Sequence, residues 1–127
     1  MMPRHGRGWL MGEGSNYGGH HSPLTISILE PALLILLKEQ PRHGYTLLGE
    51  IETLGMSTIH PSVVYRTLRE MERLGWVQSD WDIDQTQGPP RRIYRLTGQG
   101  EEVLQIWRCE LEKNQKMISD LLKRING

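Results

Sequence analysis

Five arginines stand where their side chains could bind phosphates or the edges of bases. Arg66, Arg69 and Arg73 follow one another at spacings of three and four, and Arg91 and Arg92 are adjacent further along the chain. A guanidinium group is always charged and presents its N–H donors in a flat fork, which suits bidentate hydrogen bonds to phosphate and to guanine. These residue types therefore favour nucleic-acid contact, provided that the fold brings them together.

A helix over residues 61–74 is predicted to carry the first three arginines. Pro61 suits the first turn of a helix, and Gly75 suits the position after the last turn. At about 100° per residue, Val64, Leu68 and Met71 form a narrow apolar stripe that predicts the buried side. The opposite, outward face holds Ser62, Arg66, Arg69 and Arg73.

The same arginines have a second interpretation as members of ion pairs on a solvated helix. Glu70 follows Arg66 by four residues, and Glu72 follows Arg69 by three. Exposed pairs of this kind contribute only about 0.3–0.5 kcal/mol, which does not account for the use of arginine rather than lysine. The helix by itself leaves both interpretations open.

The elements around this helix complete a recognisable order. Residues 24–37 are apolar on every side and predict a buried helix, and residues 45–54 predict a second helix that ends at Gly55. Two strand-like runs, 76–81 and 91–96, flank a connection of about nine residues and predict a hairpin with a long tip. A mainly helical chain of three helices followed by a hairpin with Arg91 and Arg92 at its edge is a winged helix-turn-helix.

A final helix is predicted after Thr97, which can cap it. Apolar residues recur every seven positions along it, at the two core positions of a heptad repeat. The polar Asn114 occupies the second core position between Trp107 and Leu121. A heptad repeat favours packing between helices, so we expect this helix to pair with a second copy of the chain; the alternative is that it packs on its own domain. The expected interface residues are Leu104, Trp107, Leu111, Ile118, Leu121 and Ile125.

The 127 residues thus divide into an arm rich in glycine and histidine (1–23), a winged domain (24–97) and a dimerisation helix (98–127). The chain holds 15 basic and 15 acidic residues, and the three parts carry net charges of +1, −1 and 0. A neutral protein gains little from general attraction to DNA and depends on placed contacts. This balance excludes a protein that coats DNA non-specifically and favours one that binds DNA sequence-specifically.

Other kinds of chemistry find little support in the sequence. The arm's histidines, at 5, 20 and 21, have no cysteine partners for zinc, and the acidic series at 80, 82 and 84 lacks the glycine and glutamate of a calcium loop, so no metal or other cofactor is expected. The single Cys109 has no activating neighbour, and no catalytic motif is present, so we expect no enzyme. The longest apolar run is too short for a membrane span, and we expect a cytoplasmic protein.

The chain resembles the PadR-like transcriptional regulators over residues 28–125. The resemblance rests on three segments: Pro41-x-His43-Gly44-Tyr45; Val64-Tyr65 with Leu68 and Glu72-Arg-Leu-Gly75; and Gly88-Pro-Pro-Arg-Arg-Ile-Tyr-Arg-Leu-Thr97. It implies a homodimer that inserts the third helix of each copy into the major groove of a pseudo-palindromic operator and places the wing on the DNA backbone. Arg66 stands where the family often has proline.

Carried over to this sequence, the family's mode of action adds further expectations. Repression relieved by a small molecule is its usual behaviour, and Trp107 is the candidate for stacking on a flat aromatic effector. The expected DNA-binding residues are Tyr45, Ser62, Tyr65, Arg66, Arg69, Arg73, Arg91 and Arg92. The alternative function is a winged-helix module that binds protein and not DNA; such a module is expected to lack the outward arginines.

Overall fold

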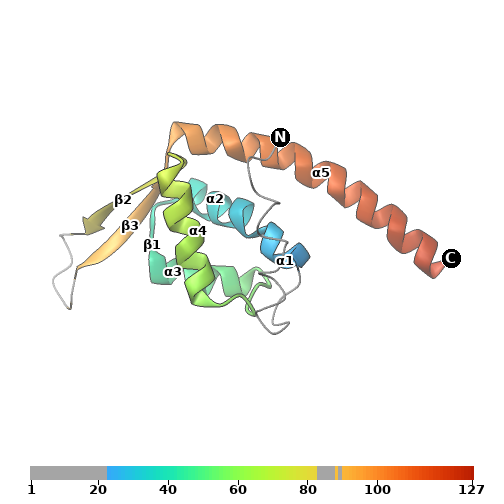
Figure 1. The fold of residues 1–127 in the computed structure, drawn as a ribbon, viewed down its shortest axis with the longest axis horizontal. Helices are drawn as coiled ribbons and strands as arrows, with labels where there is room; N and C mark the ends of the chain where they lie inside the picture. The colour runs from blue at the N-terminus through green and yellow to red at the C-terminus, as the bar shows by residue number, and fades with distance from the viewer. Residues whose placement is uncertain (1–22, 83–87, 89) are drawn as a thin grey trace.

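The computed structural model describes residues 23–82, 88 and 90–127 (Figure 1). Four helices form the body: α1 (Pro23–Ser27), α2 (Leu29–Glu39), α3 (Gly44–Thr53) and α4 (Pro61–Arg73). The strands β1 (Arg42–His43), β2 (Val77–Asp82) and β3 (Arg91–Leu96) form one antiparallel sheet in the order β1-β3-β2, and the long α5 (Gly98–Asn126) ends the chain. The predicted winged helix-turn-helix with a C-terminal helix is confirmed, while residues 1–22 of the predicted arm and Asp84 of the acidic series lie outside the described residues.

The single helix predicted over 24–37 is divided into α1 and α2 at Ile28. Pro31 has no backbone N–H, so it cannot donate to the carbonyl of Ser27 one turn earlier, and a continuous helix would lose a bond there. Eight of the eleven residues of α2 are buried, as its apolar faces predict. Ile35 is the one apolar residue of α2 that is not buried, with 40% of its surface exposed, and the polar Lys38 and Glu39 are exposed at the end of the helix.

The boundaries of α4 follow its local signals. His60 is the N-cap, Pro61 is the first helical residue, and Gly75 follows the last turn with φ +85°, a conformation that favours glycine. The hairpin begins two residues later and pairs β2 with β3 from Val77 opposite Leu96 to Asp82 opposite Arg91. Helix α4 and the hairpin are thus joined by a short, sharply turned link.

Strand β1 is an element that the sequence analysis did not predict. Arg42 and His43 pair with Tyr94 and Ile93, some fifty residues further along the chain. The Arg42 guanidinium also donates to the carbonyl oxygen of Leu36 at 2.9 Å, which satisfies the C-terminal end of α2. This strand ties the start of α3 to the hairpin.

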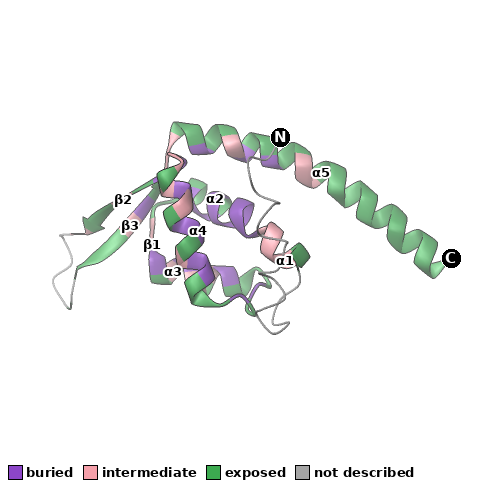
Figure 2. Cartoon of the chain, viewed as in Figure 1, coloured by how far each residue is buried: buried purple, intermediate pink, exposed green. Residues whose placement is uncertain are grey.

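Helix α5 is held to the body at its beginning and leaves it after about half its length. The Thr97 hydroxyl accepts a hydrogen bond from the Gly100 N–H at 3.0 Å, which confirms the predicted cap. Leu104 and Trp107 are buried, whereas every residue from 112 onward is exposed (Figure 2). No helix among the described residues is long and apolar enough to cross a membrane.

Candidate nucleic-acid interface

The four polar residues predicted for the outer face of α4 are all exposed. Ser62, Arg66, Arg69 and Arg73 face solvent, whereas the predicted stripe of Val64, Leu68 and Met71 is buried in the core together with Val63. The strong amphipathic pattern places the helix because burying its apolar stripe leaves only one orientation for its charged side. The helix therefore presents its arginines to solvent, and Figure 1 shows α4 next to the start of the hairpin.

The ion pairs on this helix differ from those that the spacing suggests. Glu70 binds Arg73, accepting from Nε at 3.1 Å and from Nη2 at 2.6 Å, and this hydrogen-bonded pair raises the pKa of Arg73. Glu72 accepts from the hydroxyl of Ser79 instead of binding Arg69. Within the described part of the chain, Arg69 has no hydrogen-bond or ion-pair partner, so its guanidinium is available for a ligand.

His60 is a candidate that the sequence analysis missed. Its Nδ1 accepts a hydrogen bond from the backbone N–H of Ser62 at 3.1 Å, and the Ser62 hydroxyl lies 2.9 Å from the same nitrogen. Since Nδ1 accepts, the proton of the neutral ring is on Nε2. The histidine before Pro61 is therefore both the helix cap and an exposed donor at the head of α4; its position before the helix-starting proline was the available signal.

The two wing arginines are held by aromatic rings. The Arg91 guanidinium carbon lies 4.5 Å from the centroid of the Tyr45 ring, and its Nη1 donates to the Tyr45 hydroxyl at 2.6 Å. Arg92 lies 4.6 Å over the ring of Trp81 and donates to the Ser79 hydroxyl at 2.7 Å. Neither arginine is in an ion pair with a carboxylate of the described residues, so both keep N–H donors for an anion.

A shallow pocket of about 500 Å³ lies between the wing and the start of α3. It is lined by His43, Gly44, Tyr45, Tyr65, Trp81, Arg91, Arg92 and Tyr94. Asp82, the carboxylate opposite Arg91 in the hairpin, is bound to Nε2 of His43 at 2.8 Å. The pocket therefore combines two cations with aromatic walls, and such a surface suits a phosphate group.

Tyr65 has a packing role besides the predicted role in DNA binding. A Cβ atom at Gly44 would lie 2.8 Å from Cε1 of Tyr65, so the absence of a side chain lets α3 approach α4 closely. Tyr65 is half-buried and packs against the core, whereas Tyr45 is 54% exposed. The structure thus brings Tyr45 of α3, Tyr65 of α4 and the two wing arginines together around one pocket, with Tyr45 the more accessible tyrosine.

The six residues predicted for a dimer interface fall into two groups. Leu104 and Trp107 are buried in the chain's own core, and Leu111 packs against that core. Ile118, Leu121 and Ile125 are 41%, 58% and 77% exposed. The first half of the heptad repeat therefore covers its own domain, and only the second half is left for another chain.

A groove of about 820 Å³ runs between α1, α2 and α5. Trp107 lines it with Leu24, Ile28 and Ile35 on one side and Leu111 and Ile118 on the other. In the described parts of the chain, no cluster of three or more histidine, cysteine, aspartate or glutamate residues could hold a metal ion. Charged side chains such as Lys38, Arg108 and Glu110 also line the groove, but most of its surface is apolar, which suits an apolar occupant.

Comparisons with known proteins agree with this geometry. Residues 33–106 match the family described as "Transcriptional regulator PadR-like family", whereas no curated protein matches the chain. A PadR family regulator from Eggerthella lenta DSM 2243 is 28% identical, with a TM-score of 0.68 over 78% of this chain and 85% of that one. A conserved protein of unknown function described as a potential transcriptional factor is 35% identical, with a TM-score of 0.66 over 77% and 87%.

A PadR-like transcriptional regulator from Bacillus cereus strain ATCC 14579 is 21% identical and shares the fold, with a TM-score of 0.71 over 80% of this chain and 97% of that chain. The family match covers more than half of the 127 residues. The relatives from Eggerthella lenta and Bacillus cereus are both described as transcriptional regulators. The chain belongs to the PadR-like family of transcriptional regulators.

Proposed function

We propose that the protein is a sequence-specific repressor that binds a pseudo-palindromic DNA operator as a homodimer in the cytoplasm. The observation that carries this proposal is that Arg69 on α4 and Arg91 and Arg92 on the wing are all exposed, and that none of the three is in an ion pair with a described carboxylate. Cations left unpaired in a chain of zero net charge are suited to a polyanionic partner.

The two groups of arginines suit different parts of a DNA duplex. In this proposal α4 enters the major groove, where Ser62, Arg66 and Arg69 reach base edges, because an α-helix fits that groove and arginine can bind guanine bidentately. The wing lies along the backbone, where Arg91 and Arg92 bind phosphates and fix the register. Arg73 contributes less because Glu70 already occupies its guanidinium.

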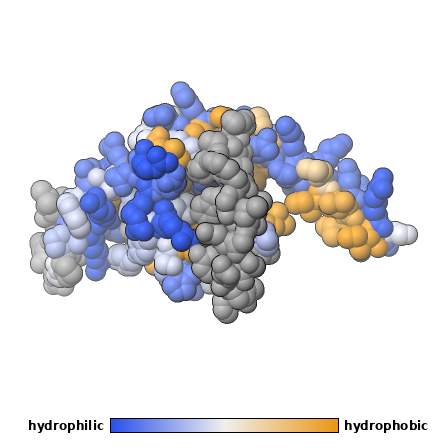
Figure 3. All heavy atoms as spheres, viewed as in Figure 1, coloured by the Kyte–Doolittle hydropathy of each residue, from blue (hydrophilic) through white to orange (hydrophobic). Residues whose placement is uncertain are grey.

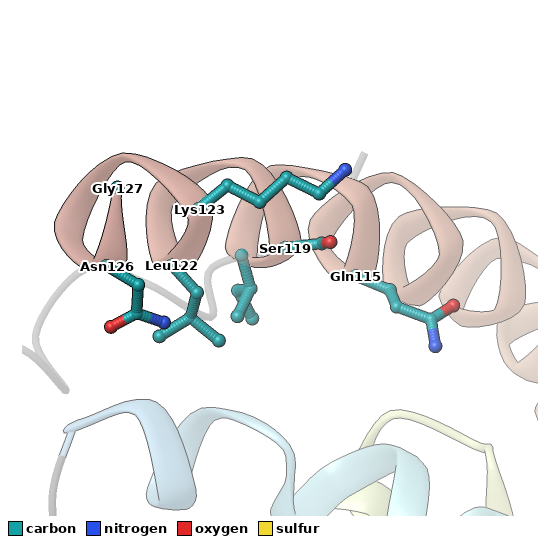
Figure 4. Close-up of a pocket in the computed structure, with 7 residues that line it drawn as sticks. Gln115, Ser119, Leu122, Lys123, Asn126 and Gly127 are labelled. Atoms are coloured by element: carbon teal, nitrogen blue, oxygen red, sulfur yellow. The ribbon is translucent and has the colours of Figure 1, made fainter.

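The distal half of α5 supports the homodimer. Five large apolar side chains are between 41% and 77% exposed there: Met117, Ile118, Leu121, Leu122 and Ile125. They form the apolar surface at the projecting end of the molecule in Figure 3, and in Figure 4 Leu122 extends from the side of the helix opposite Lys123. A helix that leaves its own domain with such a stripe is expected to bury it against a second copy, which would place two α4 helices on one duplex.

The groove beside Trp107 supports regulation by a small molecule. Its volume of about 820 Å³ and its apolar lining suit a flat aromatic effector, and the helix that forms one wall also carries the proposed dimer surface. An effector bound there would change the angle between the two copies and the spacing of their α4 helices. Release of DNA by such a compound, with a loss of that response in Trp107→Phe, is the expected result.

Band-shift assays with DNA from upstream of the protein's own gene test the central proposal. We expect a shift at nanomolar protein, with a protected sequence that has two-fold symmetry. Selection from a random DNA pool identifies the bases that are read. Absence of binding to any duplex in low salt would refute the repressor and leave the winged module that binds protein.

A further inference from the structure

Ser79 on strand β2 of the wing connects helix α4 to Arg92 on strand β3. Its hydroxyl donates to Oε2 of Glu72 on α4 at 2.8 Å and accepts from Nη1 of Arg92 on β3 at 2.7 Å. Ser79 and Glu72 are half-buried, whereas Arg92 is exposed. One hydroxyl thus joins two elements that are proposed to contact different parts of the DNA.

The chemistry of the hydroxyl group suits this connection. Serine has one proton to donate and lone pairs to accept, so it can serve a carboxylate and a guanidinium at once. Glu72 and Arg92 form no ion pair of their own among the described residues. The carboxylate therefore orients the hydroxyl without covering the guanidinium, in contrast to Glu70, which binds Arg73 at two nitrogens.

Trp81 holds the other side of the same arginine. It is the cross-strand partner of Arg92, and its ring centroid is 4.6 Å from the guanidinium carbon. A stacked guanidinium keeps the N–H groups at its edge free for hydrogen bonds in the plane. One N–H of Arg92 is bound to Ser79 and one face of its guanidinium is covered by Trp81. The guanidinium can therefore turn only a little, and its other N–H groups point in nearly fixed directions.

We propose that Ser79 and Glu72 are positioning residues for DNA binding, which hold Arg92 in the orientation that binds a backbone phosphate. This inference rests on the proposed function, since it assigns how one of its contacts is prepared. Preorganisation lowers the entropy lost when a long side chain binds. The same connection makes the wing and α4 approach DNA as one unit.

The test measures affinity for one labelled duplex, selected from a random pool by the wild-type protein, over a series of salt concentrations. We expect Arg92→Ala to reduce the slope of log K against log salt by about 0.9, the value for one phosphate contact. Ser79→Ala is expected to weaken binding about fivefold, comparable to losing one hydrogen bond. The double variant is expected to bind no more weakly than Arg92→Ala, because Ser79 acts through that arginine.

Conservative variants separate positioning from folding. Ser79→Thr and Glu72→Gln keep the hydroxyl and an acceptor oxygen and are expected to bind within about twofold of wild type, whereas Glu72→Ala is expected to resemble Ser79→Ala. Gln78→Ala, at the exposed neighbouring position of the same strand, is the matched control. Thermal unfolding is measured for every variant.

Two results would overturn the inference. The effects of Ser79→Ala and Arg92→Ala on binding could be additive, or Ser79→Ala could bind DNA as wild type does, whether or not its thermal stability falls. In each case the wild-type protein still binds DNA and the repressor proposal stands. If Ser79→Ala does not fold, Glu72→Ala and its double variant with Arg92→Ala give the same comparison. If the wild-type protein binds no DNA at all, both proposals are refuted.

Discussion

The guanidinium of Arg91 lies over the ring of Tyr45 and donates to the hydroxyl of the same residue, with a donor-to-acceptor distance of 2.6 Å. The two residues are 46 positions apart, on the wing and on α3. This contact directs a charged side chain toward the surface that α3 shares with α4. It also relates two residues that the sequence analysis named separately among the expected DNA-binding residues.

Replacement of Tyr45 is expected to weaken binding to all DNA sequences equally. Tyr45→Phe removes the acceptor of one hydrogen bond and keeps the stacked ring, so we expect a loss of about 0.5–1.5 kcal/mol in binding free energy. The base preference is expected to stay unchanged, because phosphate contacts carry no sequence information. Fluorescence anisotropy with a panel of operator variants measures both; a change in the rank order of the variants would contradict the assignment.

Arg69→Ala is expected to change base preference. Removal of a guanidinium that binds a base edge costs about 1–3 kcal/mol and relaxes selection at one position of the operator. Arg73→Ala is the matched control on the same helix face, and because Glu70 holds Arg73, we expect its affinity to stay within about twofold of wild type. Repeating the selection from a random pool with each variant tests this, and equal effects of the two substitutions would argue against a base contact by Arg69.

Ile118→Asp is expected to dissociate the homodimer. A carboxylate in the middle of the exposed apolar stripe would be buried without a partner, and we expect the dimer Kd to rise about 30-fold or more. The winged domain of the variant should unfold at the same temperature as in wild type, since Ile118 lies beyond the part of α5 that covers the core. Lys116→Asp, on a different side of the helix, is the control. Sedimentation that finds an intact dimer for Ile118→Asp at low micromolar protein would remove this residue from the interface.

Gly100→Ala is expected to destabilise the fold. A Cβ atom there would overlap the carbonyl oxygen of Trp76 and a methyl group of Leu96, so α5 would have to move away from the hairpin, at a cost of about 1–3 kcal/mol. Gly98 lies two residues earlier in the same helix, and a Cβ atom there would meet no atom within 4 Å. Gly98→Ala is therefore expected to raise the free energy of unfolding by about 0.4–1 kcal/mol. Urea unfolding of the two variants measures the contrast, and equal midpoints would show that the junction is not tightly packed.

Tyr94 predicts how stability changes at alkaline pH. Burial, and secondarily the negative charge of Glu72, raise the pKa of Tyr94 above its ordinary value of 10.0. The unfolded chain therefore loses this proton at a lower pH than the folded chain, so the stabilisation is complete below about pH 10 and is lost as the pH rises through the folded value. As the pH rises above 10, wild type should lose thermal stability more steeply than Tyr94→Phe, and parallel curves would count against this effect.

Several elements could be predicted because their signals are local. Pro61 and Gly75 bound α4 to within one residue, and Thr97 begins α5, since caps and turns depend on groups one helical turn away. The period of the apolar residues also identifies the buried side of α4. Strand β1 could not be found in this way, because two residues have no period and their pairing with β3 depends on contacts across fifty positions.

The sequence by itself determined the winged helix-turn-helix, the arginine-bearing face of α4 and the basic edge of the wing. Only the tertiary structure decided which side chain binds which: Glu70 binds Arg73, Glu72 orients Ser79, and Arg91 lies on Tyr45. It also divided the heptad of α5 into a half that covers its own core and a half left exposed. The physical reason is that periodicity reports which side of an element is apolar, whereas the partner of that side depends on which surfaces the folded chain brings together.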